Sequence, residues 1–210
     1  MRPSYNQFVD NYRYIRELDS LFLFLKGTLK LNNDLSDLLR SEIVYSVSAL
    51  DTLIHNLIRV GMVQSYYGTR LKTKKFKVFP ISAENLLNIQ STAISNLHYP
   101  TVPLPEYWFE QDVVLKHKLL AFQDPDKIAD GLSLIWDETQ KWYKISLLMS
   151  MREESVKTTL RNIVVRRNQI VHESDIDIQT GLKNKIEYDD VKISIDFIEL
   201  LGKSIFDSVK

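Results

Sequence analysis

The sequence contains no cysteine, and its 210 residues include only six glycines and six prolines. The lack of cysteine excludes disulfides, thiolate nucleophiles and cysteine-based zinc sites, and it fits a reducing compartment. The N-terminal stretch MRPSYNQFVDNYRYIRELD has no apolar core behind its first charges, so we do not expect it to be a secretory signal. The apolar run Leu21–Leu25 is far shorter than the roughly 20 residues that span a bilayer. We therefore expect a cytoplasmic protein with no membrane partner.

Neither sign of charge is in excess, because 27 Lys and Arg residues balance 27 Asp and Glu residues. A general attraction to nucleic acid, driven by counterion release, is therefore not indicated for the whole molecule. If the protein recognises phosphate, the recognition must come from a local group of residues.

Apolar residues recur at three- and four-residue spacing along most of the chain, which predicts an all-α fold of about six or seven helices. We expect a single domain, residues 1–210, with an insertion of helices and loops at about 66–135. The first helix should end near Gly27, and the second should run from about 35 to Gly61. Further helices are expected at about 83–97, 107–121, from about 125, at 137–149, at 151–173, and from about 190 to the C-terminus.

Three helix starts carry capping signals. Ser82 resembles an N-cap for the helix at 83–97. Ser150, followed three residues later by Glu153, matches a capping box for the helix at 151–173. Asp189 or Asp190 is expected to cap the last helix.

The stretch RRNQIVHESD, residues 166–175, raises the question of function. On a helical wheel, Arg167 falls inside the apolar arc of its helix, whereas Arg166 points away and is predicted to be solvated. Asn168 and His172 share a neighbouring face, and Arg161 joins them there. A charge aimed into the fold is costly unless it is paired, so Arg167 needs a partner or a ligand.

The second helix offers a candidate partner. Asp51 lies on the flank of its apolar stripe, with His55 one turn further on, and Asp51 could meet Arg167 if the two helices pack side by side. Asp51 and His55 could also be metal ligands at an i, i+4 spacing. A core or supporting role is favoured, because no third ligand has suitable spacing, and we expect no metal site and no cofactor.

A simpler interpretation of residues 166–175 is that cations near a helix C-terminus are favoured by the helix dipole. Two features argue against it: the position of Arg167 inside the apolar arc, and a motif. RNQIVH, residues 167–172, resembles the R-x4-6-H motif of the HEPN family of helical nucleases, with Asn168 as the polar residue that often follows the arginine. The stretch at 38–59, LLRSEIVYSVSALDTLIHNLIR, is similar to a helix of the RiboL-PSP-associated HEPN branch.

The resemblance implies a metal-independent endoribonuclease, typically a homodimer with its RNA site between protomers, or an inactive relative of such an enzyme. It implies catalytic roles for Arg167, Asn168 and His172: phosphate stabilisation, orientation and proton transfer. It also suggests a toxin or defence effector, for which an antitoxin or another inhibitor protein is a candidate partner. The products expected are a 2′,3′-cyclic phosphate and a 5′-hydroxyl.

A basic run could add RNA contacts, since it contains no acidic residue between its first and last cations. A solvated loop is the more common explanation of such a run. Its members are Arg70, Lys72, Lys74, Lys75 and Lys77.

Two alternatives to the ribonuclease remain open. The first is a non-catalytic HEPN-like module that uses the same surface to bind a partner protein or a nucleotide. The second is an unrelated helical scaffold in which Arg167 is only a buried ion-pair partner.

Overall fold

The computed structural model describes residues 1–97 and 103–210, and every named secondary-structure element in this part of the chain is a helix. This confirms the all-α prediction. A further helix, the single turn at residues 74–77, was not predicted from the spacing of apolar residues. The elements are α1 (Arg2–Leu23), the π-helical turn η1 (Phe24–Thr28), α2 (Ser36–Tyr67), α3 (Lys74–Lys77), α4 (Ala83–Asn96), α5 (Pro105–His117), α6 (Pro125–Leu132), α7 (Lys141–Leu148), α8 (Glu153–His172) and α9 (Tyr188–Val209).

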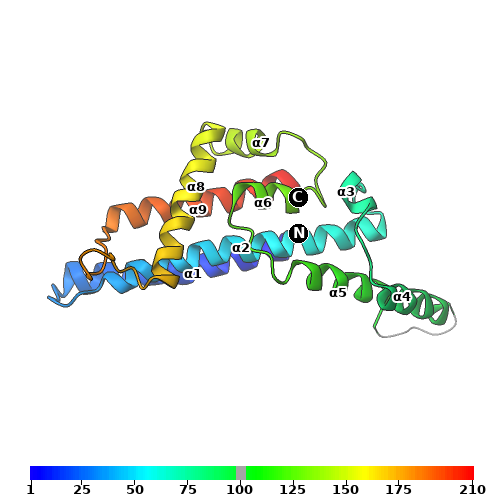
Figure 1. Cartoon of the computed structure of the whole chain (residues 1–210), viewed down its shortest axis with the longest axis horizontal. Helices are drawn as coiled ribbons and strands as arrows, with labels where there is room; N and C mark the ends of the chain where they lie inside the picture. Colours follow the sequence, from blue (N-terminus) through cyan, green and yellow to red (C-terminus); the bar gives the residue numbers. More distant parts are fainter. Residues whose placement is uncertain (98–102) are drawn as a thin grey trace.

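Helix α2 is the centre of the fold. It contacts α1, α5, α6, α8 and α9, and apolar residues along its length, from Leu39 to Met62, are fully buried. Figure 1 shows α1, α2 and α9 following the long axis of the molecule, while α8 crosses them steeply. The crossing brings the C-terminal end of α8 down onto α2. None of the described helices is long and apolar enough to cross a membrane.

The two ends of the chain pack against each other through aromatic residues. The ring of Tyr5 stacks on that of Phe206 with 4.4 Å between centroids, and the hydroxyl of Tyr12 donates to the carbonyl of Ile195 at 3.1 Å. A Cβ atom at Gly202 would lie 2.4 Å from the Phe8 ring, so only glycine allows α9 to approach α1 this closely. Helices α1, α2 and α9 therefore form a frame on which α8 rests.

The prediction that α2 ends at Gly61 is wrong, because the helix continues to Tyr67 and ends at Gly68 in the left-handed conformation, φ 78°. Gly61 is buried inside the helix, and a Cβ atom there would lie 2.6 Å from Cγ2 of Ile135. Gly61 therefore allows α2 to pack closely against Ile135, and it does not end the helix.

Two of the three capping predictions are also wrong. Ser82 does cap α4, accepting a hydrogen bond from the backbone N–H of Asn85 at 3.2 Å. Helix α8, however, starts after Arg152 without a side-chain cap, because Ser150 lies at a positive φ of 53° in the preceding turn. Helix α9 starts after Glu187, so Asp189 and Asp190 fall in its first turn.

The expected insertion at 66–135 holds α3 to α6, and its residues 98–102 lie outside the described part of the chain. Helix α4 has no fully buried residue and packs against α5. Figure 1 shows this pair at one end of the molecule, away from the C-terminal end of α8.

Candidate functional site

The Arg–Asn–His motif occupies the last two turns of α8. The helix is held to the core by Val156, Leu160 and Ile163, all fully buried. Beyond them the helix becomes more exposed as it approaches its end at His172. The motif therefore lies on a rigid helix and is partly exposed to solvent, as a site for a large ligand must be.

Arg167 is half-buried, as its place in the apolar arc predicted. Its Nη1 donates to Oδ1 of Asn168 at 3.0 Å. Its Nε is shielded from solvent and has no hydrogen-bond partner among the described residues. Six other arginines pair with carboxylates: Arg13, Arg16, Arg40, Arg59, Arg161 and Arg166. Within the described chain, Arg167 has no such neutralising partner.

His172 is the last residue of α8, and it is exposed. Within residues 1–97 and 103–210, no hydrogen bond to its ring is found, and the oxygen of Asn168 accepts from Arg167. Within this chain, therefore, Asn168 orients the arginine and not the histidine.

The supporting residues that the sequence suggested lie elsewhere. Asp51 accepts a hydrogen bond from the backbone N–H of Phe122 at 2.5 Å, and the ring of His55 lies 3.1 Å from the carbonyl oxygen of Leu120. Together they fasten the segment between α5 and α6 to α2. The expected pairing of Asp51 with Arg167 is wrong.

Arg161 lies on the same face of α8 as Asn168 and His172, as the helical wheel predicted, because the helix is continuous from Glu153 to His172. It lies too far along that face to join the motif. Its guanidinium lies 3.7 Å from a carboxylate oxygen of Asp126 and 3.9 Å from one of Asp124, at the start of α6. Eleven residues of helix separate it from His172, about 16 Å along the axis.

The basic run divides into structural and exposed members. Arg70 donates to the carbonyls of Ile135 at 3.1 Å and Val209 at 2.5 Å, so its donors are already used within the fold. Lys75 forms an ion pair with Asp130. Lys72 and Lys74 are exposed and remain candidates for RNA contact.

Arg166 differs from its prediction, because its side chain is partly buried and paired instead of free in solvent. It donates through Nη1 and Nη2 to both carboxylate oxygens of Asp175, the second at 2.9 Å. Asp175 is fully buried and also accepts from Nε of Arg40 on α2 at 2.5 Å. Burial alone would raise the pKa of the Asp175 carboxyl, but the hydrogen bonds from Arg40 and Arg166 hold that pKa below its usual value.

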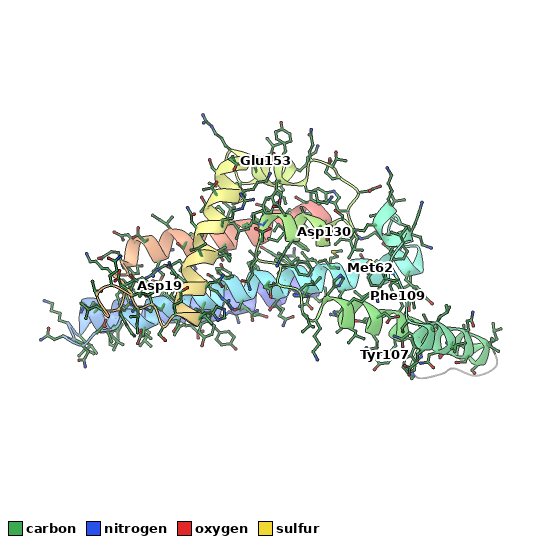
Figure 2. All side chains as sticks on the ribbon, in the orientation of Figure 1. Asp19, Met62, Tyr107, Phe109, Asp130 and Glu153 are labelled. Atoms are coloured by element: carbon green, nitrogen blue, oxygen red, sulfur yellow. The ribbon has the colours of Figure 1, made fainter. Side chains whose placement is uncertain are left out.

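A second buried acid was also missed. Glu42 on α2 has 0% of its surface exposed, and neither carboxylate oxygen has a partner among the described residues. Burial, with Asp19 as a second cause, raises the pKa of Glu42 to about 7. Figure 2 places Asp19 on the half of the molecule that carries the end of α8, away from Tyr107 and Phe109.

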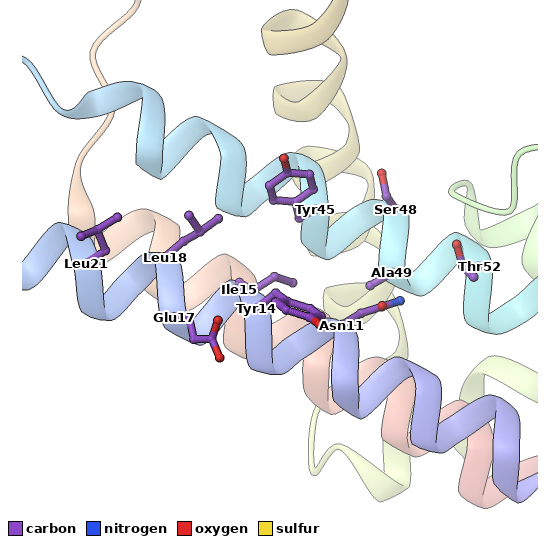
Figure 3. Close-up of a pocket in the computed structure, with 10 residues that line it drawn as sticks. All are labelled: Asn11, Tyr14, Ile15, Glu17, Leu18, Leu21, Tyr45, Ser48, Ala49 and Thr52. Carbon is purple, nitrogen blue, oxygen red and sulfur yellow. The ribbon is translucent and has the colours of Figure 1, made fainter.

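An apolar groove of about 650 Å³ runs between α1 and α2 (Figure 3). Tyr14, Leu18 and Leu21 line it from α1, and Tyr45 and Ala49 from α2. Tyr45 also lines a smaller hollow, of about 360 Å³, that reaches Ile170 and Ser174 at the end of α8. The groove and the motif region therefore share a boundary at Tyr45.

The described residues contain no group of three or more histidine and acidic side chains that could hold a metal ion.

The Arg–Asn–His motif at the end of α8, packed on a long central helix α2 that is flanked by α1 and α9, is the arrangement of one class of helical protein. The family model described as RiboL-PSP-HEPN matches residues 9–210, so the chain belongs to this HEPN family. Neither the curated proteins nor the solved structures contain a match.

Proposed function

We propose that the chain is a metal-independent endoribonuclease whose site is built from Arg167, Asn168 and His172. The observation that supports this most is the state of Arg167, a half-buried guanidinium with no carboxylate partner in the described chain and a shielded Nε without an acceptor. A partly buried charge in this state is unfavourable unless a ligand neutralises it. A phosphate group would do so, with the planar guanidinium as its donor.

The chemistry requires few protein groups, because RNA carries its own nucleophile in the 2′-hydroxyl. His172 would take or give a proton, since imidazole titrates near neutral pH. Arg167 would stabilise the charge that develops on the phosphate in the transition state. Asn168, which already accepts from Arg167 Nη1, would hold the guanidinium in place.

The motif supplies one histidine per protomer, which is too few for both an acid and a base, so the proposal includes a homodimer with two motifs at one site. The groove between α1 and α2 is the candidate interface. It is apolar, its Tyr14 and Tyr45 are exposed, and through Tyr45 it adjoins the hollow at the end of α8. A second copy on this face would bring a second His172 toward the first.

The rival function is a non-catalytic module that binds a partner protein or a nucleotide on the same surface. One observation favours it: the His172 ring has no hydrogen bond within the described residues that would fix its orientation. An enzyme would have to gain that orientation in the dimer or on binding RNA.

The experiment that separates the two functions measures binding and cleavage independently. The binding probe is a single-stranded RNA in which every 2′-hydroxyl is methylated, so that it cannot be cut. The enzyme should bind this probe and cleave the unmodified strand. A module of the rival kind would bind the probe, or a partner, without cutting either strand.

The cellular role belongs to the same proposal. A cytoplasmic ribonuclease without a restraint would damage its own cell, so a toxin or defence effector controlled by an inhibitor protein is the role that fits such an activity. Co-expression with the product of a neighbouring gene, followed by co-purification and a cleavage assay, tests this role.

A further inference from the structure

The last turn of α8 is closed by an ion network. From Arg166 the helix runs through His172, and the chain then turns back so that the Asp175 carboxylate accepts hydrogen bonds from Nη1 and Nη2 of Arg166. His172 thus lies inside a short loop of chain whose two ends are joined by a salt bridge. Helix ends normally fray, because their last carbonyls lack partners. Here the fraying is opposed by side chains.

The backbone after His172 is held in an unfavourable conformation. Ser174 and Asp175 have positive φ values of 54° and 57°, a region that residues other than glycine rarely occupy. Two such residues in succession persist only where the surroundings fix them. The backbone N–H of Asp175 donates to the carbonyl of Gln169 at 3.0 Å, and its carbonyl accepts from the N–H of Asn184 at 2.7 Å.

The same network ties the turn to α2. Arg40 reaches Asp175 through Nε and the carbonyl of Asn184 through Nη2, at 2.5 and 2.7 Å. One turn earlier, Asp37 pairs with Lys183 at 2.6 Å. The end of α8 and the loop after it are therefore fixed to the central helix at two points.

We propose that Asp175, held by Arg40 and Arg166, is a positioning residue that sets the place of the His172 backbone at the end of α8. The His172 ring has no side-chain partner in the described chain, so its position comes from the backbone of this turn. The low pKa of the Asp175 carboxyl keeps it charged, and keeps the network intact, at neutral pH. This inference rests on the proposed function for its kinetic readout only.

The test compares Asp175→Asn with the wild-type chain and with Asp177→Asn. Asp177 lies in the same loop, but among the described residues its carboxylate accepts only from Gln179 and Thr180, so its variant is a matched control. The primary readout is the NMR signals of the histidine rings, which does not require cleavage. We expect the His172 signals to move toward those of a free histidine in Asp175→Asn alone, while those of His55 and His117 stay in place.

Kinetics supply the second readout. Asp175→Asn should lower kcat by about 10- to 100-fold, because a small displacement of a catalytic group has an effect of that size, and KM should change by less than about 2-fold. Arg166→Lys, which keeps the charge but not the paired donors, should give an intermediate shift of the His172 signals. It takes the place of Asp175→Asn if that variant does not fold.

His172 signals that remain at their wild-type positions in both variants would overturn the positioning role, whatever the cleavage assay gives. A wild-type chain that cuts no RNA would instead refute the proposed function. The NMR comparison would still decide whether Asp175 positions His172.

Discussion

Two adjacent arginines on α8 have different surroundings. Arg166 is neutralised by the buried Asp175, whereas Arg167 contacts only the uncharged Asn168 among the polar groups described. A helix places successive side chains about 100° apart, so one can serve the fold and the other a ligand. We infer that Arg166, whose charge is neutralised, stabilises the fold, and that Arg167, whose charge is not neutralised, is available to a ligand.

The buried Glu42 makes the stability of the protein depend on pH. Its pKa is raised to about 7 by burial and by Asp19, above the value of about 4.3 in an unfolded chain. The folded state therefore binds the proton more tightly than the unfolded state does. Stability should be greatest below about pH 4.3 as far as Glu42 is concerned, and it should fall as the pH rises through 7.

Glu42→Gln removes this titration and keeps the shape of the side chain. At pH 8.5 the variant should be more stable than the wild type by roughly 2–4 kcal/mol, because the wild type must keep a charged carboxylate buried. At pH 5 the two should differ much less. Urea unfolding at both pH values measures the difference, and equal differences at pH 5 and 8.5 would show that Glu42 does not titrate in this range.

At the scale of elements, the closed end of α8 should contribute strongly to stability. Arg166→Ala leaves the Asp175 carboxylate with only Arg40 as a charged partner, in a fully buried place. Breaking a buried ion pair in this way costs about 3–5 kcal/mol. Urea unfolding measures this loss of stability. The control variant is Arg152→Ala, which changes an exposed arginine at the start of the same helix. Equal stabilities would mean that the network contributes little.

We expect Arg70 to join helices to one another and not to bind RNA. It links the end of α2 to Ile135 and to the last residues of α9, so Arg70→Ala should lower stability by about 1.5–3 kcal/mol. Arg70→Ala should not change the affinity for RNA. Lys74→Ala, which removes an exposed lysine of the same run, should lower that affinity if the run binds phosphate. Filter binding at two salt concentrations and urea unfolding test both statements. A loss of affinity in a stable Arg70→Ala variant would contradict this assignment.

The helices and the motif could be predicted from the sequence because both are local patterns. Periodicity located α8 to within two residues at its N-terminal end and one at its C-terminal end. The role of Gly61 could not be predicted in this way, because it depends on Ile135, more than seventy residues away. The partner of Arg166 could not be predicted either, because Asp175 lies in a turn with two positive φ values and is shared with Arg40 on α2. Tertiary contacts and an irregular turn therefore decided the two errors.

At the scale of the whole molecule, the proposed activity depends on a second copy. Tyr14→Glu places a charge on an exposed residue of the α1–α2 groove, which should prevent association because burying that charge is unfavourable. Light scattering after size-exclusion chromatography should give a monomer that no longer cleaves RNA. Leu119→Glu, at a leucine that is 93% exposed outside the groove, should remain dimeric and active. A wild-type chain that cleaves RNA as a monomer would contradict the composite site.

The central claim is that Arg167 and His172 cut RNA by activating its own 2′-hydroxyl. The most direct measurement incubates end-labelled single-stranded RNA, with a chelator present, with the wild-type chain or with His172→Ala. The wild type should leave 2′,3′-cyclic phosphate and 5′-hydroxyl ends, and His172→Ala should be slower by about 10²–10⁴-fold while remaining folded. Equal cleavage by the two proteins, or cleavage by neither, would contradict the account.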